Sequence, residues 1–166
     1  MDSPHQDADS RRFLALMSLH KYFLNASLLR DIFQKRLGAK PPEPTAHGHA
    51  DDVAMLDTTA AMSLWYATLY VVIEGWRDAG LSDPSVDALL KDDLTDRLRV
   101  FRNQTFHYQK TYDNPRLLEF LGTGDEAAAR VTAWVQQTHN ELGRAIVEAI
   151  SRLVPSAKGT GNNHPL

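Results

Sequence analysis

The sequence predicts an all-α protein, most simply an antiparallel up-and-down bundle of four long helices with shorter helical pieces. Three observations lead to this prediction. Apolar residues recur at helical spacing in several long segments, glycine or proline stands between those segments, and no alternating apolar and polar stretch is bounded by hairpin signals. A chain of 166 residues suits one domain, which we place at residues 10–154, after a flexible N-terminus at 1–9 and before a flexible tail at 155–166.

Two long helices are predicted in the first half of the chain. Residues 10–37 form the first, which Gly38 ends, and its apolar stripe should face the core: Phe13, Met17, Leu24, Leu28 and Ile32. A loop follows at residues 39–50, because its three prolines are incompatible with a helix interior. Asp51 and Asp52 favour the start of the second helix, which should run to about Ala79. Its predicted buried residues are Met55, Leu56, Met62, Trp65, Leu69, Val72, Ile73 and Trp76.

The second half predicts shorter helices and one more long one. Pro84 after a Ser or Asp cap starts a helix that either continues or breaks briefly at residues 91–93, and the apolar pattern then resumes at Leu94, Leu98 and Phe101. A turn at 111–116 and a short helix at 115–121 follow. The last helix starts at Asp125 and turns these side chains inward: Val131, Trp134, Val135, Leu142, Ile146, Ile150 and Leu153.

Composition excludes several classes of protein. The chain has no cysteine, so disulfide frameworks, thiolate metal sites and cysteine nucleophiles are excluded, and we expect neither a metal nor a cofactor. The longest apolar run, residues 60–73, is 14 residues long, whereas a membrane span needs about 20. The N-terminus is acidic and polar where a signal peptide would be basic and then apolar. We therefore expect a cytoplasmic protein with no membrane partner.

The most informative stretch is VFRNQTFHYQK at residues 100–110, which contains Arg102, Asn103 and His107. The net charge of the chain is −3, yet residues 96–116 hold five basic against two acidic side chains, a zone compatible with a few phosphates and equally with a solvated helix face. On an unbroken helix Arg102 and His107 would lie about 140° around the axis and about 7.5 Å along it from each other. They converge on one group only if the helix ends before His107, or if two chains pack about a two-fold axis.

This stretch resembles the Arg-polar-x-x-x-His motif of HEPN domains, the higher eukaryote and prokaryote nucleotide-binding superfamily. The resemblance extends over the whole chain, in the order of two long helices followed by shorter ones. It implies a metal-independent endoribonuclease, often a toxin or defence protein, in which two protomers line one cleft. Arg102 and His107 match the catalytic pair, and Asn103 matches the polar position. A toxin subgroup has a tyrosine two residues after the histidine, which a nucleotidyltransferase antitoxin modifies, but Gln109 stands there in this chain.

These residue types suit RNA cleavage by attack of the 2′-hydroxyl, which leaves a 2′,3′-cyclic phosphate. An imidazole such as that of His107 can take the hydroxyl proton or protonate the leaving oxygen. The planar fork of Arg102 fits phosphate oxygens, and Asn103 could orient His107 or hold a phosphate oxygen. Further candidates for substrate contacts are Arg99, Tyr108, Lys110 and Glu74.

Other interpretations stay open. Arg102 and His107 could simply end a helix in water, where the helix dipole favours cations, and Glu74 could be a structural ion-pair partner of Arg102. The chain could be a non-catalytic HEPN-like module that binds nucleotide, RNA or a partner protein, or an unrelated helical interaction domain. On the ribonuclease interpretation the expected partners are RNA, a second copy of the chain and an antitoxin protein.

Overall fold

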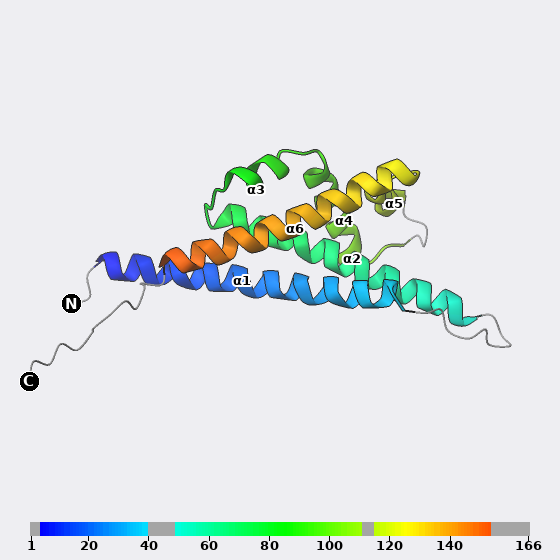
Figure 1. The fold of residues 1–166 in the computed structure, drawn as a ribbon, viewed down its shortest axis with the longest axis horizontal. Helices are drawn as coiled ribbons and strands as arrows, with labels where there is room; N and C mark the ends of the chain where they lie inside the picture. The colour runs from blue at the N-terminus through cyan, green and yellow to red at the C-terminus, as the bar shows by residue number, and fades with distance from the viewer. Residues whose placement is uncertain (1–3, 40–48, 111–114, 154–166) are drawn as a thin grey trace, which may run out of the picture.

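The computed structural model describes residues 4–39, 49–110 and 115–153, and all regular elements in these ranges are helices. The all-α prediction is confirmed for them. The helices are α1 (Pro4–Leu37), α2 (His49–Asp78), α3 (Pro84–Leu89), α4 (Leu94–Phe106), α5 (Pro115–Leu121) and α6 (Asp125–Leu153) (Figure 1).

Helix α2 is the central element, because it contacts α1, α4 and α6. Helices α1 and α2 run in opposite directions: Leu19 lies beside Gly75, and Arg36 near the end of α1 pairs with Asp57 near the start of α2. Helix α6 lies across α1 (Figure 1). There the ring of Phe23 packs 4.9 Å from that of His139 and leaves no room for a side chain at Gly143.

The core surrounds α2, between it and α1, α4 and α6, and the long apolar run of α2 forms its largest part. Trp65, Leu69, Ile73 and Trp76 are each at most 2% exposed, as the sequence predicts. By length and mean hydropathy, residues 52–78 could also cross a membrane. Because these apolar side chains pack against the neighbouring helices, we interpret α2 as a core helix.

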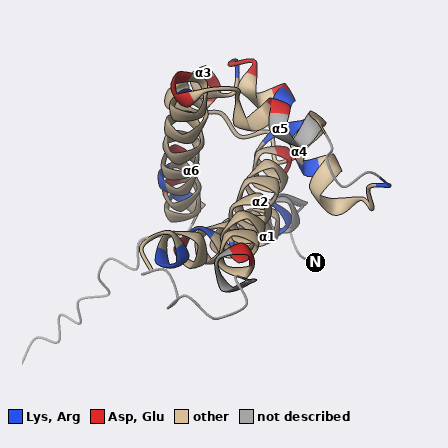
Figure 2. Ribbon diagram, turned by 90° about the vertical axis from the view of Figure 1, so that its right-hand side faces the viewer, with Lys and Arg blue, Asp and Glu red and all other residues tan. Residues whose placement is uncertain are grey.

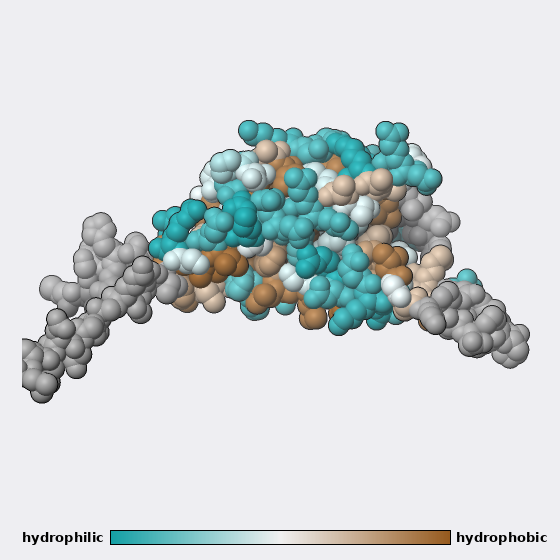
Figure 3. Space-filling view, viewed as in Figure 1, coloured by the Kyte–Doolittle hydropathy of each residue, from teal (hydrophilic) through white to brown (hydrophobic). Residues whose placement is uncertain are grey.

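The predicted buried face of α1 is wrong. Leu24 and Leu28 are 53% and 60% exposed, and Phe13 and Met17 also reach the surface, where Figure 3 shows hydrophobic side chains along α1. The buried residues are instead Leu16, Leu19 and Ala26. Apolar residues occur on more than one face of this helix, so its period does not reveal which face meets the core.

The prediction of burial is also wrong for two residues at the start of α2. Met55 and Leu56 are 63% and 53% exposed, although their spacing matches that of the buried residues. The physical reason is the length of α1, which ends at Leu37, opposite Asp57. Within the described ranges, α2 therefore extends beyond the helix that would cover these two side chains.

Two helix boundaries differ from the predictions. Helix α1 begins at Pro4 rather than at residue 10; a proline fits the first turn of a helix. Helix α2 begins at His49, inside the predicted loop at 39–50, whose residues 40–48 lie outside the described part, as does the predicted tail at 155–166. The helix that starts at Pro84 is interrupted at residues 90–93, which is one of the two possibilities that the sequence left open, so α3 and α4 are separate helices.

Candidate functional site

Helix α4 is held in place by aromatic packing immediately before the Arg102 motif. Phe101 is 1% exposed, and its ring lies 6.1 Å from that of Tyr66 on α2 and 5.1 Å from that of Phe120 on α5. Leu98 and Leu94 are buried about one and two turns earlier. The rotation of α4 is thereby fixed, and Arg102 is directed along the surface of α2.

The guanidinium of Arg102 lies in a pre-formed cluster on α2 and α4. Its Nη2 group donates to Glu74 Oε2 of α2 in a close ion pair, and its Nη1 group donates to Asn103 Oδ1 at 2.9 Å. The guanidinium carbon lies 5.7 Å from the centre of the Tyr70 ring, within range of a cation–π interaction. The Arg102 side chain is 27% exposed, and its hydrogen bonds to Glu74 and Asn103 hold the guanidinium in one orientation.

Two groups in this cluster still have hydrogen bonds to offer. Arg102 Nε is buried and has no hydrogen-bond partner among the described residues. The Asn103 side chain uses its oxygen for Arg102, which leaves its amino group as a donor. Asn103 therefore orients Arg102, whereas the sequence suggested that it could orient His107. A phosphate at the edge of this cluster would meet the Asn103 amino group and the exposed part of the Arg102 guanidinium, but not the buried Nε.

Tyr70 is the member of the cluster that the sequence did not reveal. It is 3% exposed, and burial, followed by the Glu74 carboxylate, raises the pKa of its hydroxyl above the ordinary value. The nearby guanidinium groups of Arg77, Arg99 and Arg102 act in the opposite direction. The signal available in the sequence was its spacing: Tyr70 and Glu74 are four residues apart and share one face of α2.

His107 lies outside the helix. Helix α4 ends at Phe106, and His107 has extended backbone angles, φ −110° and ψ 139°, with its N–H donating to Asn103 O at 3.2 Å. The helix therefore ends before His107. This is one of the two conditions under which Arg102 and His107 could point toward the same group. Its imidazole is exposed and makes no hydrogen bond to any other side chain in the described part of the molecule.

The other side chains proposed to contact the substrate have fewer interactions with the protein and are more exposed, except that of Glu74. Arg99 Nε lies 3.7 Å from Asp96 Oδ1, with about half of the Arg99 side chain exposed. Tyr108 is 91% exposed, and Lys110 is also exposed. Glu74 belongs to the Arg102 cluster, as the ion-pair interpretation predicted. Figure 2 shows both basic and acidic residues about α4 and α5, and the side chains of Asp113 and Arg116 lie outside the described set.

Comparisons with known proteins identify no relative of this chain. The chain matches no protein-family model, and no curated protein or solved structure matches it significantly. Within the described ranges, no three His, Asp or Glu side chains are grouped so that they could hold a metal ion. The candidate site considered for RNA consists of the Arg102 cluster and the exposed imidazole of His107, which follows α4.

The Glu74–Arg102 pair should contribute measurably to stability. In a double-mutant cycle with Glu74→Gln and Arg102→Gln, we expect a coupling energy of about 0.5–1 kcal/mol in urea unfolding, because the pair is half-buried and hydrogen-bonded. The matched control is the Arg99–Asp96 pair, whose side chains are 53% and 85% exposed and should show almost no coupling. Equal coupling in the two cycles would contradict a pre-formed Arg102 cluster.

Proposed function

We propose that this chain is a metal-independent endoribonuclease of the HEPN kind, with an up-and-down helical bundle and an active site completed by a second copy. The observation that carries the proposal is the end of α4 at Phe106. It leaves the His107 imidazole exposed, five residues after an arginine whose guanidinium is already oriented by Glu74 and Asn103. A cytoplasmic toxin or defence role, with an antitoxin as partner, belongs to the same proposal.

The reaction needs only groups that the two copies would supply. One His107 takes the proton of the RNA 2′-hydroxyl, whose oxygen then forms a bond to phosphorus. The bond from phosphorus to the 5′-oxygen breaks, and the His107 of the other copy protonates that oxygen. Arg102 and the Asn103 amino group stabilise the charge on the non-bridging phosphate oxygens.

A second candidate function is the binding of RNA or nucleotide without cleavage. The position of Glu74 favours this alternative over catalysis, because its carboxylate already pairs with Arg102 and would repel a phosphate that approaches Arg102. Under this alternative Arg102 mainly serves the packing of α4 on α2, and the exposed basic residues near it bind the ligand. RNA that is retained by the protein but stays uncut would support this function.

Cleavage in the presence of EDTA tests the first proposal directly. We expect the wild-type protein to cut a mixed panel of structured and single-stranded RNAs with EDTA present, and the upstream fragments to end in 2′,3′-cyclic phosphate. Mass spectrometry of the fragments identifies that end group. An RNA with a 2′-deoxy nucleotide at the cleavage position should stay intact, because it lacks the attacking oxygen. Full-length RNA throughout the panel would instead favour the non-catalytic binder.

The protein should form a two-fold dimer through a surface that includes residues 97–112. Phe106 and Tyr108, beside His107, are 50% and 91% exposed, an unusual exposure for two neighbouring aromatic residues. Sedimentation at micromolar concentration should give a dimer, and Phe106→Glu should produce monomers with little cleavage activity. Leu24→Glu is the matched control on the exposed face of α1. A dimer that only Leu24→Glu disrupts would place the interface elsewhere.

A further inference from the structure

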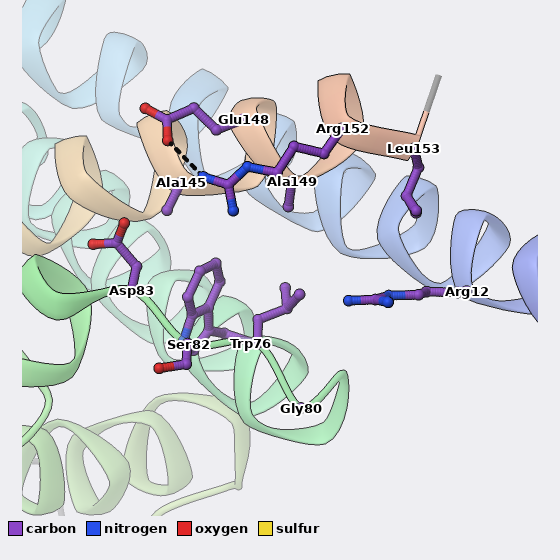
Figure 4. Close-up of a pocket in the computed structure, with 11 residues that line it drawn as sticks. Arg12, Trp76, Gly80, Ser82, Asp83, Ala145, Glu148, Ala149, Arg152 and Leu153 are labelled. Atoms are coloured by element: carbon purple, nitrogen blue, oxygen red, sulfur yellow. Dashed lines mark hydrogen bonds and ion pairs between the residues drawn. The ribbon is translucent and has the colours of Figure 1, made fainter. Parts of the chain in front are cut away.

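A pocket of about 330 Å³ lies at the other side of α2, between the end of α6, the start of α1 and the turn after α2 (Figure 4). Trp76 of α2 reaches into it from the centre of the molecule. Glu74 and Trp76 are two residues apart, about 200° around the helix axis, so they face nearly opposite sides of α2. This Trp76 pocket is therefore separate from the Arg102 cluster. Its lining residues are Arg12, Trp76, Gly80, Leu81, Ser82, Asp83, Ala145, Glu148, Ala149, Arg152 and Leu153.

The inner part of the Trp76 pocket is apolar. The indole of Trp76 is 2% exposed, and Leu81, Ala145, Ala149 and Leu153 complete the apolar lining. The indole N–H is buried and has no acceptor among the described residues, whereas those of Trp65 and Trp134 both have one. A small apolar ring would find apolar side chains to pack against here, because the edge of the indole and the small alanine side chains line the space.

Two guanidinium groups stand at the mouth of the pocket. Figure 4 shows Arg12 from α1 and Arg152 from α6 extending toward the space around the Trp76 indole. Arg12 makes no hydrogen bond or ion pair within the described part of the chain. Arg152 makes a long contact of 3.4 Å with Glu148. Both side chains are exposed and can turn toward an anion that enters the pocket.

The acidic side chains of the pocket are occupied by another residue. Arg144 bonds to Asp83 at 2.8 Å and to Glu148 at 2.9 Å. Asp83 also accepts the backbone N–H groups of Ser85 and Val86 at the start of α3, and the bond from Arg144, the largest effect, lowers the pKa of its carboxyl. Arg144 also bonds to Glu141, so its single charge does not offset all of these carboxylates, and Glu148 keeps its 3.4 Å contact with Arg152. Arg12 is therefore the guanidinium of the lining that has no ion pair among the described residues.

We propose that the Trp76 pocket binds a small organic anion that has an aromatic or apolar ring and one carboxylate or phosphate group. The ring packs against the indole, and the anionic group is held by the forks of Arg12 and Arg152, which suit both acids. A pocket of this size lies at the lower end of the range of small-molecule sites.

Nuclear magnetic resonance of the three tryptophan indole N–H groups tests this assignment on the intact chain. Titration with adenosine 5′-monophosphate and with indole-3-acetate should shift the Trp76 signal, identified by its loss in Trp76→Phe, and leave those of Trp65 and Trp134 unmoved. The two compounds distinguish a phosphate from a carboxylate ligand. Adenosine, which has the ring but no anion, should bind at least about tenfold more weakly, since a hydrogen-bonded charge pair is lost.

Variants at the mouth of the pocket decide whether the anion is bound there. The double substitution Arg12→Gln and Arg152→Gln should weaken binding about tenfold, while Arg11→Gln, the same change one residue along α1, should not. Unmoved Trp65 and Trp134 signals would show that the variants are folded. The proposal is overturned if neither anion shifts the Trp76 signal at millimolar concentration, or if the double variant binds as well as the wild type.

Discussion

Replacing His107 with alanine is expected to lower the rate of RNA cleavage by about 10²- to 10⁴-fold, the range that a proton-transferring residue contributes. The free energy of unfolding should change by less than about 0.5 kcal/mol, because the imidazole is exposed and lies beyond the end of α4. Single-turnover cleavage of a labelled RNA and urea unfolding measure the two quantities on the same protein. A large loss of activity without a loss of stability would support a catalytic role, because a residue that only ends a helix should not affect cleavage.

Chemical rescue separates proton transfer from an indirect effect of the His107→Ala substitution. Free imidazole at tens of millimolar should restore part of the cleavage rate, since it can occupy the space of the missing ring and carry the proton. His20→Ala serves as the matched control, because His20 is a half-buried histidine on α1 outside the Arg102 cluster. Equal loss of activity in both variants, or no response to imidazole, would remove His107 from the proposed mechanism.

Arg102 should behave differently from His107, because it also belongs to the packed cluster. Arg102→Ala should abolish cleavage and also destabilise the protein, since it leaves the Glu74 carboxylate without its partner. Arg102→Lys should recover stability better than activity, because an ammonium group can pair with Glu74 but cannot present two parallel donors to a phosphate. The comparison of these two variants separates the ion pair with α2 from the contact with the substrate.

The helices were predictable wherever local chemistry determines them. Asp83 and Pro84 start α3 as their residue types suggest, and α5 and α6 begin at the predicted Pro115 and Asp125. The buried face of α1 was not predictable, because it depends on where α2 and α6 lie, and apolar residues such as Leu24 and Leu28 are available on the wrong side. Periodicity reports that a helix has an apolar stripe, not which neighbour will cover it.

The same limit applies to the candidate site. The motif itself could be found from residues 102–107, since its members are close in sequence. The link between Arg102 and Glu74 spans 28 residues and depends on the packing of α4 on α2, to which Phe101 contributes. Tyr70 lies in the apolar run of α2, where the sequence predicts core residues and gives no sign of a site. The Trp76 pocket is formed by residues from α1, α2 and α6, which are far apart in the sequence. Sites of this kind become visible only when the packing of the helices is known.

A buried histidine should make the fold sensitive to mild acid. His139 of α6 is 1% exposed, and its Nδ1 atom accepts the indole N–H of Trp65 at 3.1 Å. Because an indole nitrogen only donates, the imidazole proton must sit on Nε2, which lies 3.2 Å from Ser27 Oγ and donates to it. A second proton on Nδ1 would face the Trp65 N–H. The neutral ring is therefore the form that fits the core.

Burial, more than the nearby Arg30 guanidinium, lowers the pKa of His139 from 6.5 to about 4, and Asp31 opposes this shift only in part. A folded state that resists protonation loses stability as the pH falls below 6.5, and the loss continues until about pH 4. Between pH 7.5 and pH 5.0 the free energy of unfolding should fall by about 2 kcal/mol on this account. Asp83 and Asp93 have lowered pKa values, so their stabilising effects are lost at lower pH than this window.

Urea unfolding at pH 7.5 and pH 5.0 measures this loss, and His139→Asn is the matched variant. An asparagine side-chain oxygen can accept the Trp65 N–H in place of Nδ1, but it does not take up a proton in this pH range. The variant should be less stable than the wild type at pH 7.5, by about 1–3 kcal/mol, because it loses the bond to Ser27 and leaves a small cavity. Its stability should then change far less on acidification, although the six other histidines are still present. If the variant and the wild type lose stability in parallel between the two pH values, His139 is not the group that makes the fold acid-sensitive.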